Sequence, residues 1–307
     1  MLYWKFVLVF LFGVSVSINA LANAQDCDEL EIPITFDSDG LPIIELNVNG
    51  SNHHVLLDLG SSEGIHLPIA EIKNIPEIKY TGNTVKSSNI SGDIYEAKEF
   101  FIPSLKIQCL TFDHIKGVEL NPWAASIGEN RVHDTSEQIV VGLDLFKNKT
   151  LLLNYSDKVL IIKSSEVKPL SLSITNPTSY TLSKEGLSIK VSSINASYQM
   201  VLDTGASSTI FVANKVNPKE DIKSCEFDLG PNMECKVFES SLKILGYNFQ
   251  SNALLYPIDE RFKMDGILGR DFFEQFVVEI NFLNKTILLA PIVADNSKLH
   301  DKKLNKD

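Results

Sequence analysis

After residue 24 the chain has no apolar run long enough to span a bilayer, so we expect no stable membrane anchor. Positive charge is also scarce, because 28 Lys and Arg residues stand against 39 Asp and Glu residues, a formal net charge of −11. An acidic chain repels phosphate backbones, so we expect no nucleic-acid partner. The sequence also contains no long amphipathic helical pattern, and we therefore predict mostly β structure.

Cysteine is sparse, and its spacing does not suit a metal. The four cysteines, Cys27, Cys109, Cys225 and Cys235, contain no C-x-x-C pair, and the six histidines show no ligand spacing, so we expect no metal and no other cofactor. An even number of cysteines in an exported chain instead predicts two disulfides. Cys225 and Cys235 flank a Gly-Pro-Asn turn and would close one hairpin, which leaves Cys27 to pair with Cys109.

The N-terminus has the pattern of a secretory signal. Lys5 supplies a short basic region, residues 6–16 form an apolar core of signal-peptide length, and Ala22-Asn23-Ala24 is an A-x-A cleavage motif. We therefore expect residues 1–24 to be removed and the protein to be secreted or periplasmic. A membrane anchor is the alternative, but the flanking residues favour cleavage.

The mature chain contains an internal repeat. Aligning Asp58 on Asp203 without gaps places Ile44 on Ile189, and a second block, residues 142–162, aligns without gaps on residues 269–289. The identical pairs in this second block are Gly142/Gly269, Asp144/Asp271, Phe146/Phe273, Asn154/Asn281 and Lys158/Lys285. Because two blocks recur in the same order in both halves, we interpret the chain as a duplicated domain.

The repeat predicts two lobes of β structure. We expect an N-terminal lobe over residues 25–167, a C-terminal lobe over residues 168–293 and a disordered tail over residues 294–307, with the boundary in a stretch rich in Ser, Thr and Pro. Residues 187–191 alternate between apolar and polar side chains, as a half-buried strand should. The segment that follows Gly269 predicts one short helix.

Each copy presents an acid at the end of an apolar strand. Asp203 follows residues 200–202 and precedes Thr204, Gly205 and Ala206. Glycine lets the backbone adopt conformations that other residues resist, and small neighbours let a second backbone approach closely. Two carboxylates about 3 Å apart cannot both ionise, so a facing pair keeps one proton. The ionised acid can then activate a water while the protonated acid donates to a substrate carbonyl.

At these residues the sequence resembles the retropepsin and pepsin superfamily of aspartic proteases. Residues 201–206, apolar-apolar-Asp-Thr-Gly-Ala, match its active-site motif. Residues 267–269, Ile-Leu-Gly, match its second motif, and the resemblance covers nearly all of the mature chain, once per half. It implies an all-β fold of two tandem retropepsin-like β-barrel lobes related by a pseudo-two-fold axis, with Asp58 facing Asp203.

The resemblance also implies a function and a set of site residues. The protein would be an exported aspartic endopeptidase that acts on a peptide or protein substrate as a monomer, its two lobes forming an intramolecular pseudo-dimer. The implied catalytic residues are Asp203 and Asp58, and the implied supports of the catalytic loops are Thr204, Gly205, Ala206, Gly60 and Ser61.

The first copy departs from the family pattern. Leu59 stands where the family has Thr or Ser, whose hydroxyl helps to hold the two loops together. We therefore expect Thr204 to lack its mirror partner, at a cost of about 1–3 kcal/mol for a buried unpaired hydroxyl. Ser61 would hydrogen-bond the Asp58 carboxylate and favour its charged form, a bond that Ala206 cannot give in the second copy.

Two alternatives remain open because of Leu59. The protein could be active only as a homodimer through Asp203, or it could be a non-catalytic peptide-binding pseudo-protease in which Asp58 is a relic. Family members also close a β-hairpin flap over the substrate, and residues 81–95 and 225–235 are the candidate hairpins. The first copy is longer than the second between its acid and its second motif, and we place the extra residues within 118–137.

Overall fold

The computed structural model describes residues 27–48, 51–75, 77–88, 92–120, 138–164, 177–216, 222–225 and 235–292. The predicted signal, most of the lobe boundary and the predicted tail lie outside these residues, as does nearly all of the first-copy insertion. The described chain is nearly all β, which confirms the predicted fold class. None of its helices is long and apolar enough to cross a membrane.

The described residues of the first lobe form ten strands and two helical turns. Its strands are β1 (Glu29–Phe36), β2 (Pro42–Val48), β3 (Ser51–Leu57), β4 (Ile65–Leu67), β5 (Lys79–Ser88), β6 (Ile94–Ile107), β7 (Leu110–Glu119), β8 (Ile139–Val141), β9 (Lys149–Asn154) and β10 (Val159–Ser164). Its helical turns are α1 (Ile69–Ile72) and the 3-10 helix η2 (Leu143–Phe146).

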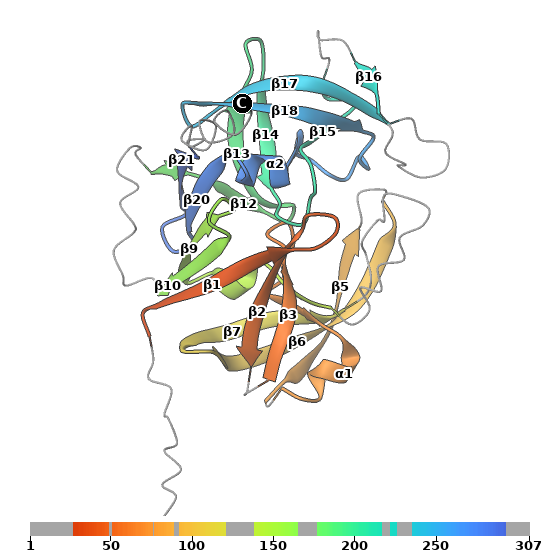
Figure 1. Ribbon diagram of the computed structural model, residues 1–307. Coiled ribbons are helices and arrows are strands. Elements are labelled where there is room, and N and C mark those ends of the chain that lie inside the picture. Colours follow the sequence, from red (N-terminus) through yellow and green to blue (C-terminus); the bar gives the residue numbers. More distant parts are fainter. Residues whose placement is uncertain are drawn as a thin grey trace, which may run out of the picture.

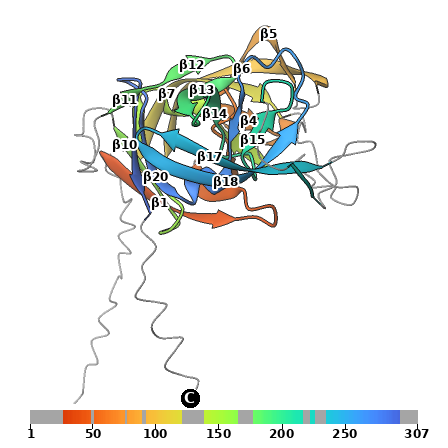
Figure 2. The ribbon, with the colours of Figure 1, turned by 90° about the horizontal axis from the view of Figure 1, so that it is seen from above.

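The described residues of the second lobe form the remaining strands and one helical turn. Its strands are β11 (Thr178–Ser179), β12 (Thr181–Ser183), β13 (Gly186–Ser192), β14 (Ser197–Leu202), β15 (Ile210–Val212), β16 (Lys223–Ser224), β17 (Lys236–Ile244), β18 (Tyr247–Tyr256), β19 (Gly266–Leu268), β20 (Phe276–Asn281) and β21 (Thr286–Pro291). The helical turn α2 (Arg270–Phe273) is the short helix expected after Gly269. In Figure 2 the long strands β17 and β18 lie side by side across this lobe.

The sequence repeat is also a repeat of strand pairing. In the first lobe β3 lies parallel to β8, and β4 lies antiparallel to β8 and parallel to β7. In the second lobe β14 lies parallel to β19, and β15 lies antiparallel to β19 and parallel to β18. The duplication inferred from the sequence therefore describes two copies of one fold.

One sheet joins the two lobes. Strands β1, β10 and β9 of the first lobe continue through β20, β21 and β11 of the second, as the left of Figure 1 shows. At the junction Leu151 lies opposite Ile280 and Leu153 lies opposite Val278. The alignment of Asn154 on Asn281 also places Leu151 on Val278 and Leu153 on Ile280, so superposing one copy on the other turns each of these two pairs into the other. Leu152 is aligned on Glu279, which is also its partner in the sheet, so the pseudo-two-fold axis passes at this pair.

Aromatic side chains pack the lobes together beneath this sheet. Tyr155 of the first lobe stacks on Phe273 of α2, with ring centroids 5.4 Å apart, and its edge meets Phe36 at 4.9 Å. Phe146 of η2 lies 6.3 Å from Phe282 of the second lobe. Pairs of this kind stabilise by about 0.5–1.5 kcal/mol beyond their buried area. They fix α2 and η2, the two turns that follow the second motif of each copy.

Both predicted disulfides are present. Cys27 pairs with Cys109, with a Cα–Cα distance of 5.3 Å, and Cys225 pairs with Cys235 at 5.1 Å. The first bond spans 82 residues in sequence and holds Cys27, the first described residue, on the β6–β7 turn. A loop of that size contributes about 4 kcal/mol by restricting the unfolded chain. Two such bonds indicate an oxidising, extracellular type of environment.

Candidate active site

The two acids occupy equivalent places at the ends of β3 and β14. The N–H of Asp58 donates to the carbonyl of Val141 at 2.9 Å, and the N–H of Asp203 donates to the carbonyl of Leu268 at 3.0 Å. The acceptors end β8 and β19, which run parallel to the strands that carry the acids. The apolar strand of the second motif therefore fixes the backbone of each acid from the side.

The glycine of the second motif is required by close packing against the catalytic loop. A Cβ atom at Gly142 would lie 2.7 Å from the carbonyl oxygen of Ser61, and one at Gly269 would lie 2.8 Å from that of Ala206. In each copy the N–H of the next residue donates to the same oxygen at 2.9 Å. A side chain at either glycine would force the catalytic loop out of this position.

The structure brings the carboxyl groups of Asp58 and Asp203 together, and they hydrogen-bond to each other. A Cβ atom at Gly205 would lie 2.8 Å from Asp58 Oδ1 and 3.1 Å from Asp203 Oδ1, and one at Gly60 would lie 2.5 Å from both oxygens of Asp203. The N–H of Gly60 donates to Asp58 Oδ1 at 2.9 Å, and that of Gly205 donates to Asp203 Oδ1 at 2.7 Å. Each glycine leaves room for the acid of the other lobe.

The two acids differ in their electrostatic surroundings. Burial raises the pKa of Asp58, but the hydrogen bond from Asp203 and the N–H groups of Gly60 and Ser61 oppose this rise. Burial raises the pKa of Asp203 well above its usual value, and the charge of Asp58 raises it further. The pKa of each acid is therefore raised, and the pair keeps one proton between its two carboxyl groups.

Thr204 bonds to the opposite lobe. Its hydroxyl accepts from the N–H of Leu59 at 2.9 Å and donates to the carbonyl of Leu57 at 2.6 Å. The prediction that this hydroxyl lacks a partner is therefore wrong, because its partners are main-chain groups of residues 57 and 59, which do not depend on the side chain of Leu59. The Leu59 side chain is fully buried in the apolar core and returns no equivalent bonds to the second lobe.

The Ser61 hydroxyl also differs from its predicted role. The hydroxyl oxygen lies 2.6 Å from Nε2 of His66. The sequence had predicted a hydrogen bond from this hydroxyl to the Asp58 carboxylate. The Asp58 carboxylate instead accepts the main-chain N–H of Gly60 at 2.9 Å, and the N–H of Ser61 donates to the main-chain carbonyl of Asp58 at 3.2 Å. His66 is buried, and burial lowers its pKa to about 3, so its ring is neutral.

Sequence reasoning missed the pair of Ser61 and His66, although the repeat contained a signal. The alignment of Asp58 on Asp203 places Ser61 on Ala206 and His66 on Phe211. Two polar residues in one copy therefore replace two apolar residues in the other. A correlated change of this kind indicates contact between the two positions, and searching the histidines for metal-ligand spacing could not reveal it.

The first candidate flap is a hairpin that reaches the second lobe. Strands β5 and β6 pair antiparallel, with Ser88 opposite Ile94 at the far end of the described ladder. Just before β6, the carbonyl of Gly92 accepts a hydrogen bond from Nη2 of Arg261 in the second lobe, at 2.6 Å. The second candidate flap begins at β16 and ends at β17, but residues 226–234 lie outside the described part.

Within the described residues, no group of three or more His, Cys, Asp or Glu side chains is arranged to hold a metal ion. The donor set at the dyad consists of two carboxyl groups that already bond to each other and to main-chain N–H groups. The chemistry that this arrangement offers is proton transfer between two acids of unequal pKa.

No family model and no curated protein sequence matches the chain. Among solved structures, the chain is similar to the crystal structure of an aspartic proteinase from Irpex lacteus, with a TM-score of 0.55 and 14% sequence identity. The match covers 86% of this chain and 98% of the other. At this identity the likeness concerns the fold, and the chain therefore has the two-lobed fold of a pepsin-like proteinase.

Proposed function

We propose that the protein is an aspartic endopeptidase in which Asp58 is the general base and Asp203 is the general acid. The observation that carries this proposal is the pair of buried carboxyl groups, one from each lobe, that lie together between the N–H groups of Gly60 and Gly205 and whose pKa values are both raised. Such a pair holds one proton over a wide range of pH, which is the state that acid–base catalysis needs.

The proposed reaction begins with a water held between the two acids. Asp58 removes a proton from this water, which attacks the carbonyl carbon of the peptide bond, and Asp203 donates its proton to the carbonyl oxygen. The tetrahedral intermediate then breaks its C–N bond, while Asp58 gives its proton to the leaving nitrogen and Asp203 regains a proton from the hydroxyl that becomes the new carboxyl group. Each acid ends the cycle in its original state.

The geometry around the dyad supports these roles. The two bonds of the Thr204 hydroxyl cross from one lobe to the other and hold the acids in register. Both acids also accept main-chain N–H groups, from Gly60 and Gly205, which fix their carboxylate planes. Groups held in this way need little reorganisation during proton transfer.

We further propose that the protein works as a monomer outside the cytoplasm. Asp58 already stands opposite Asp203, so one chain supplies both acids without a second copy. The two disulfides suit secretion or the periplasm. A peptide or protein is the proposed substrate, since an amide carbonyl is the group that this pair of acids can hydrate.

One observation favours a second candidate, a peptide-binding protein without activity. Leu59 fills the position of a hydroxyl residue, so the two hydrogen bonds that the Thr204 side chain makes to the first lobe have no reciprocal pair from residue 59 to the second lobe. A looser dyad would retain the fold and lose catalysis, because small displacements of reacting groups are costly in rate.

Cleavage of an unfolded protein substrate separates these candidates. The chain starting at residue 25 should cleave denatured casein at some pH between about 3 and 7, the range in which a carboxylate pair holds a single proton. Pepstatin, which mimics the tetrahedral intermediate, should abolish that cleavage. Absence of cleavage across the whole range, with pepstatin still bound, would favour the binding protein.

A further inference from the structure

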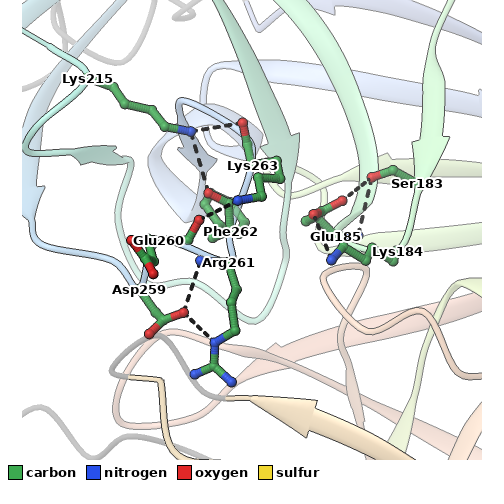
Figure 3. Close-up of polar contacts among 9 residues, drawn as sticks. All are labelled: Ser183, Lys184, Glu185, Lys215, Asp259, Glu260, Arg261, Phe262 and Lys263. Carbon is green, nitrogen blue, oxygen red and sulfur yellow. Dashed lines mark hydrogen bonds and ion pairs between the residues drawn. The ribbon is translucent and has the colours of Figure 1, made fainter.

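Serine hydroxyls elsewhere in this chain point at neighbouring carboxylates. In the second lobe the hydroxyl of Ser183 donates to Oε2 of Glu185 at 2.8 Å, a bond drawn at the right of Figure 3. In the first lobe the hydroxyl of Ser104 donates to Oδ1 of Asp113, which lies opposite it in the sheet, at 2.7 Å. Hydrogen bonds to an ionised acceptor are the stronger kind, so a serine beside an acid is expected to adopt this orientation.

Ser61 follows Asp58 by three residues and does not have this orientation. Its hydroxyl oxygen lies 2.6 Å from Nε2 of His66, and among the described residues it makes no hydrogen bond to the Asp58 carboxyl group. The acid is nevertheless close, because the main-chain N–H of Ser61 donates to the main-chain carbonyl of Asp58 at 3.2 Å and lowers the pKa of its side chain. A serine hydroxyl has three staggered positions, and the contact with His66 selects one that leaves Asp58 without this donor.

His66 is held in place by the sheet. It lies on β4, where it pairs with Val140 of β8 on one side and with Val118 of β7 on the other, and only 7% of the residue is exposed. The second motif confines Ser61 as well, since a Cβ atom at Gly142 would lie 2.9 Å from the Cβ atom of the serine. A fixed histidine therefore determines where the Ser61 hydroxyl lies, whichever ring nitrogen carries the proton.

The second lobe withholds the same donor from its own acid in a different way. The repeat aligns Ser61 on Ala206, so the loop after Asp203 has no hydroxyl at this position. It aligns His66 on Phe211, which has no nitrogen to hold one. Each acid therefore accepts a main-chain N–H of its own loop but no hydroxyl from the residue after the glycine. Because a hydrogen bond to a carboxylate favours its charged form, withholding these donors favours the protonated form of the pair.

We propose that His66 is a positioning residue that holds the Ser61 hydroxyl away from Asp58, so that the dyad lacks this donor. This inference rests on the proposed peptidase function, because it concerns the same pair of acids. Its consequence is that the pair binds a second proton at a higher pH than it would if Ser61 donated to Asp58. A doubly protonated pair has no base to activate water, so His66 sets the acidic limit of activity.

The histidine stays neutral at this limit. The segments that flank His66, residues 63–71, residues 116–120 and strand β8, carry the titratable groups Glu63, Glu71, Lys116 and Glu119. Burial lowers the pKa of His66 to about 3, whereas burial raises the pKa of Asp58 above its usual 3.8. Beside the dyad, burial and the charge of Asp203 raise the pKa of Tyr155, so its phenol stays protonated. The carboxyl pair is therefore the group that titrates at the acidic limit.

The first test measures the dyad without any substrate. Carbon-13 NMR of labelled aspartate follows the carboxyl titration of the pair, with signals assigned from Asp58→Asn and Asp203→Asn. His66→Phe releases the Ser61 hydroxyl and should move the first ionisation of the pair to lower pH by about one unit, the effect of one hydrogen bond to a charged group. The double variant, His66→Phe with Ser61→Ala, should titrate as the wild type does, because no hydroxyl remains to be released.

His66→Gln is the matched control. Its side-chain amide keeps a hydrogen-bonding group for the Ser61 hydroxyl, so this variant should keep the wild-type titration. Ser61→Ala alone should keep it too, because in the wild type this hydroxyl does not bond to Asp58, and this variant tests the inference without any change at His66. Phe211 fills the equivalent position on β15, so a phenylalanine suits the fold.

Three results would overturn the inference. The first is an unchanged titration in His66→Phe. The second is a titration that moves to higher pH in Ser61→Ala, which would mean that the hydroxyl already bonds to the acid. The third is an equal shift in His66→Phe with and without Ser61, which would mean that the shift does not pass through the serine.

The second test uses a peptide that the wild type cleaves. The acidic limb of the kcat/KM profile reports the ionisation of the free enzyme, so it should move to lower pH by about one unit in His66→Phe and return in the double variant. An equal loss of activity at every pH, with the limb unmoved, would overturn the positioning role. Failure of the proposed function is distinguishable, because a wild type that cleaves nothing would still show the carboxyl titration by NMR.

Discussion

The hydroxyl of Thr204 donates to the carbonyl of Leu57, a main-chain group of the opposite lobe, at 2.6 Å. The same hydroxyl accepts the N–H of Leu59, so one side chain satisfies two buried main-chain groups next to Asp58. The first lobe can thus lose its own hydroxyl residue while the contact between the two catalytic loops survives.

Thr204→Val should destabilise the fold. Valine has nearly the shape of threonine but leaves the Leu59 N–H and the Leu57 carbonyl without a partner, which costs about 1–3 kcal/mol for each buried group. Urea unfolding of the purified protein measures the loss. Thr204→Ser keeps the hydroxyl and should lose less, and a valine variant as stable as the wild type would contradict the contact.

Leu59→Thr should lower stability without lowering activity. The new hydroxyl can bond to the N–H of Thr204 and the carbonyl of Leu202, but two hydrogen bonds add only about 1–3 kcal/mol. Removing a fully buried leucine side chain from the core costs about 2–5 kcal/mol, and this larger effect should prevail. Unfolding and peptide cleavage, measured on one preparation, check both statements, and a loss of activity would show that Leu59 is itself needed.

Asp203→Asn should be more stable than the wild type at neutral pH. The pKa of Asp203 is raised well above its usual 3.8, so above pH 3.8 the unfolded chain binds fewer protons than the folded protein. Stability from this group is therefore lost as pH rises from the unfolded toward the folded pKa. Asparagine does not titrate, so thermal unfolding should favour the variant at about pH 7, and the difference should shrink near about pH 4. Equal stability at neutral pH would contradict the raised pKa.

Ser61 and His66 should be energetically coupled. Ser61→Ala removes the oxygen that faces Nε2 of His66, and His66→Phe removes the nitrogen that faces the serine. The double variant has the same two residue types as Ala206 and Phe211 of the second lobe. It removes both sides of the Ser61–His66 contact together, so neither side is left facing an apolar group. A double-mutant cycle at neutral pH should give a coupling of about 0.5–3 kcal/mol. Strictly additive effects would mean that the contact contributes nothing.

Much of the fold could be predicted because it repeats in the sequence. The apolar residues before Asp58 and Asp203 predicted the strands β3 and β14 that end at these acids, and the segment after Gly269 predicted the helical turn α2. The disulfides followed from cysteine number and one turn signal. These features depend on local pattern and on composition, which a single sequence records directly.

The contacts of individual polar side chains were harder to predict. Thr204 bonds to main-chain atoms, which carry no sequence signal, so the identity of residue 59 misled the prediction. The Ser61 side chain in the loop after Asp58 points toward His66 of β4, and this side-chain orientation is not revealed by sequence spacing. The hydrogen bond from Arg261 to the carbonyl of Gly92 joins two lobes at segments that have no common motif.

The central claim is that Asp58 and Asp203 act as one pair within a single chain. Cleavage of a peptide by Asp58→Asn, purified as a monomer, tests this most directly, with Asp203→Asn and the double variant measured beside it. Because one acid must be ionised while the other carries the proton, each single variant should lose cleavage while remaining folded, and the double variant should be no worse than either. Full activity in monomeric Asp58→Asn would contradict the account.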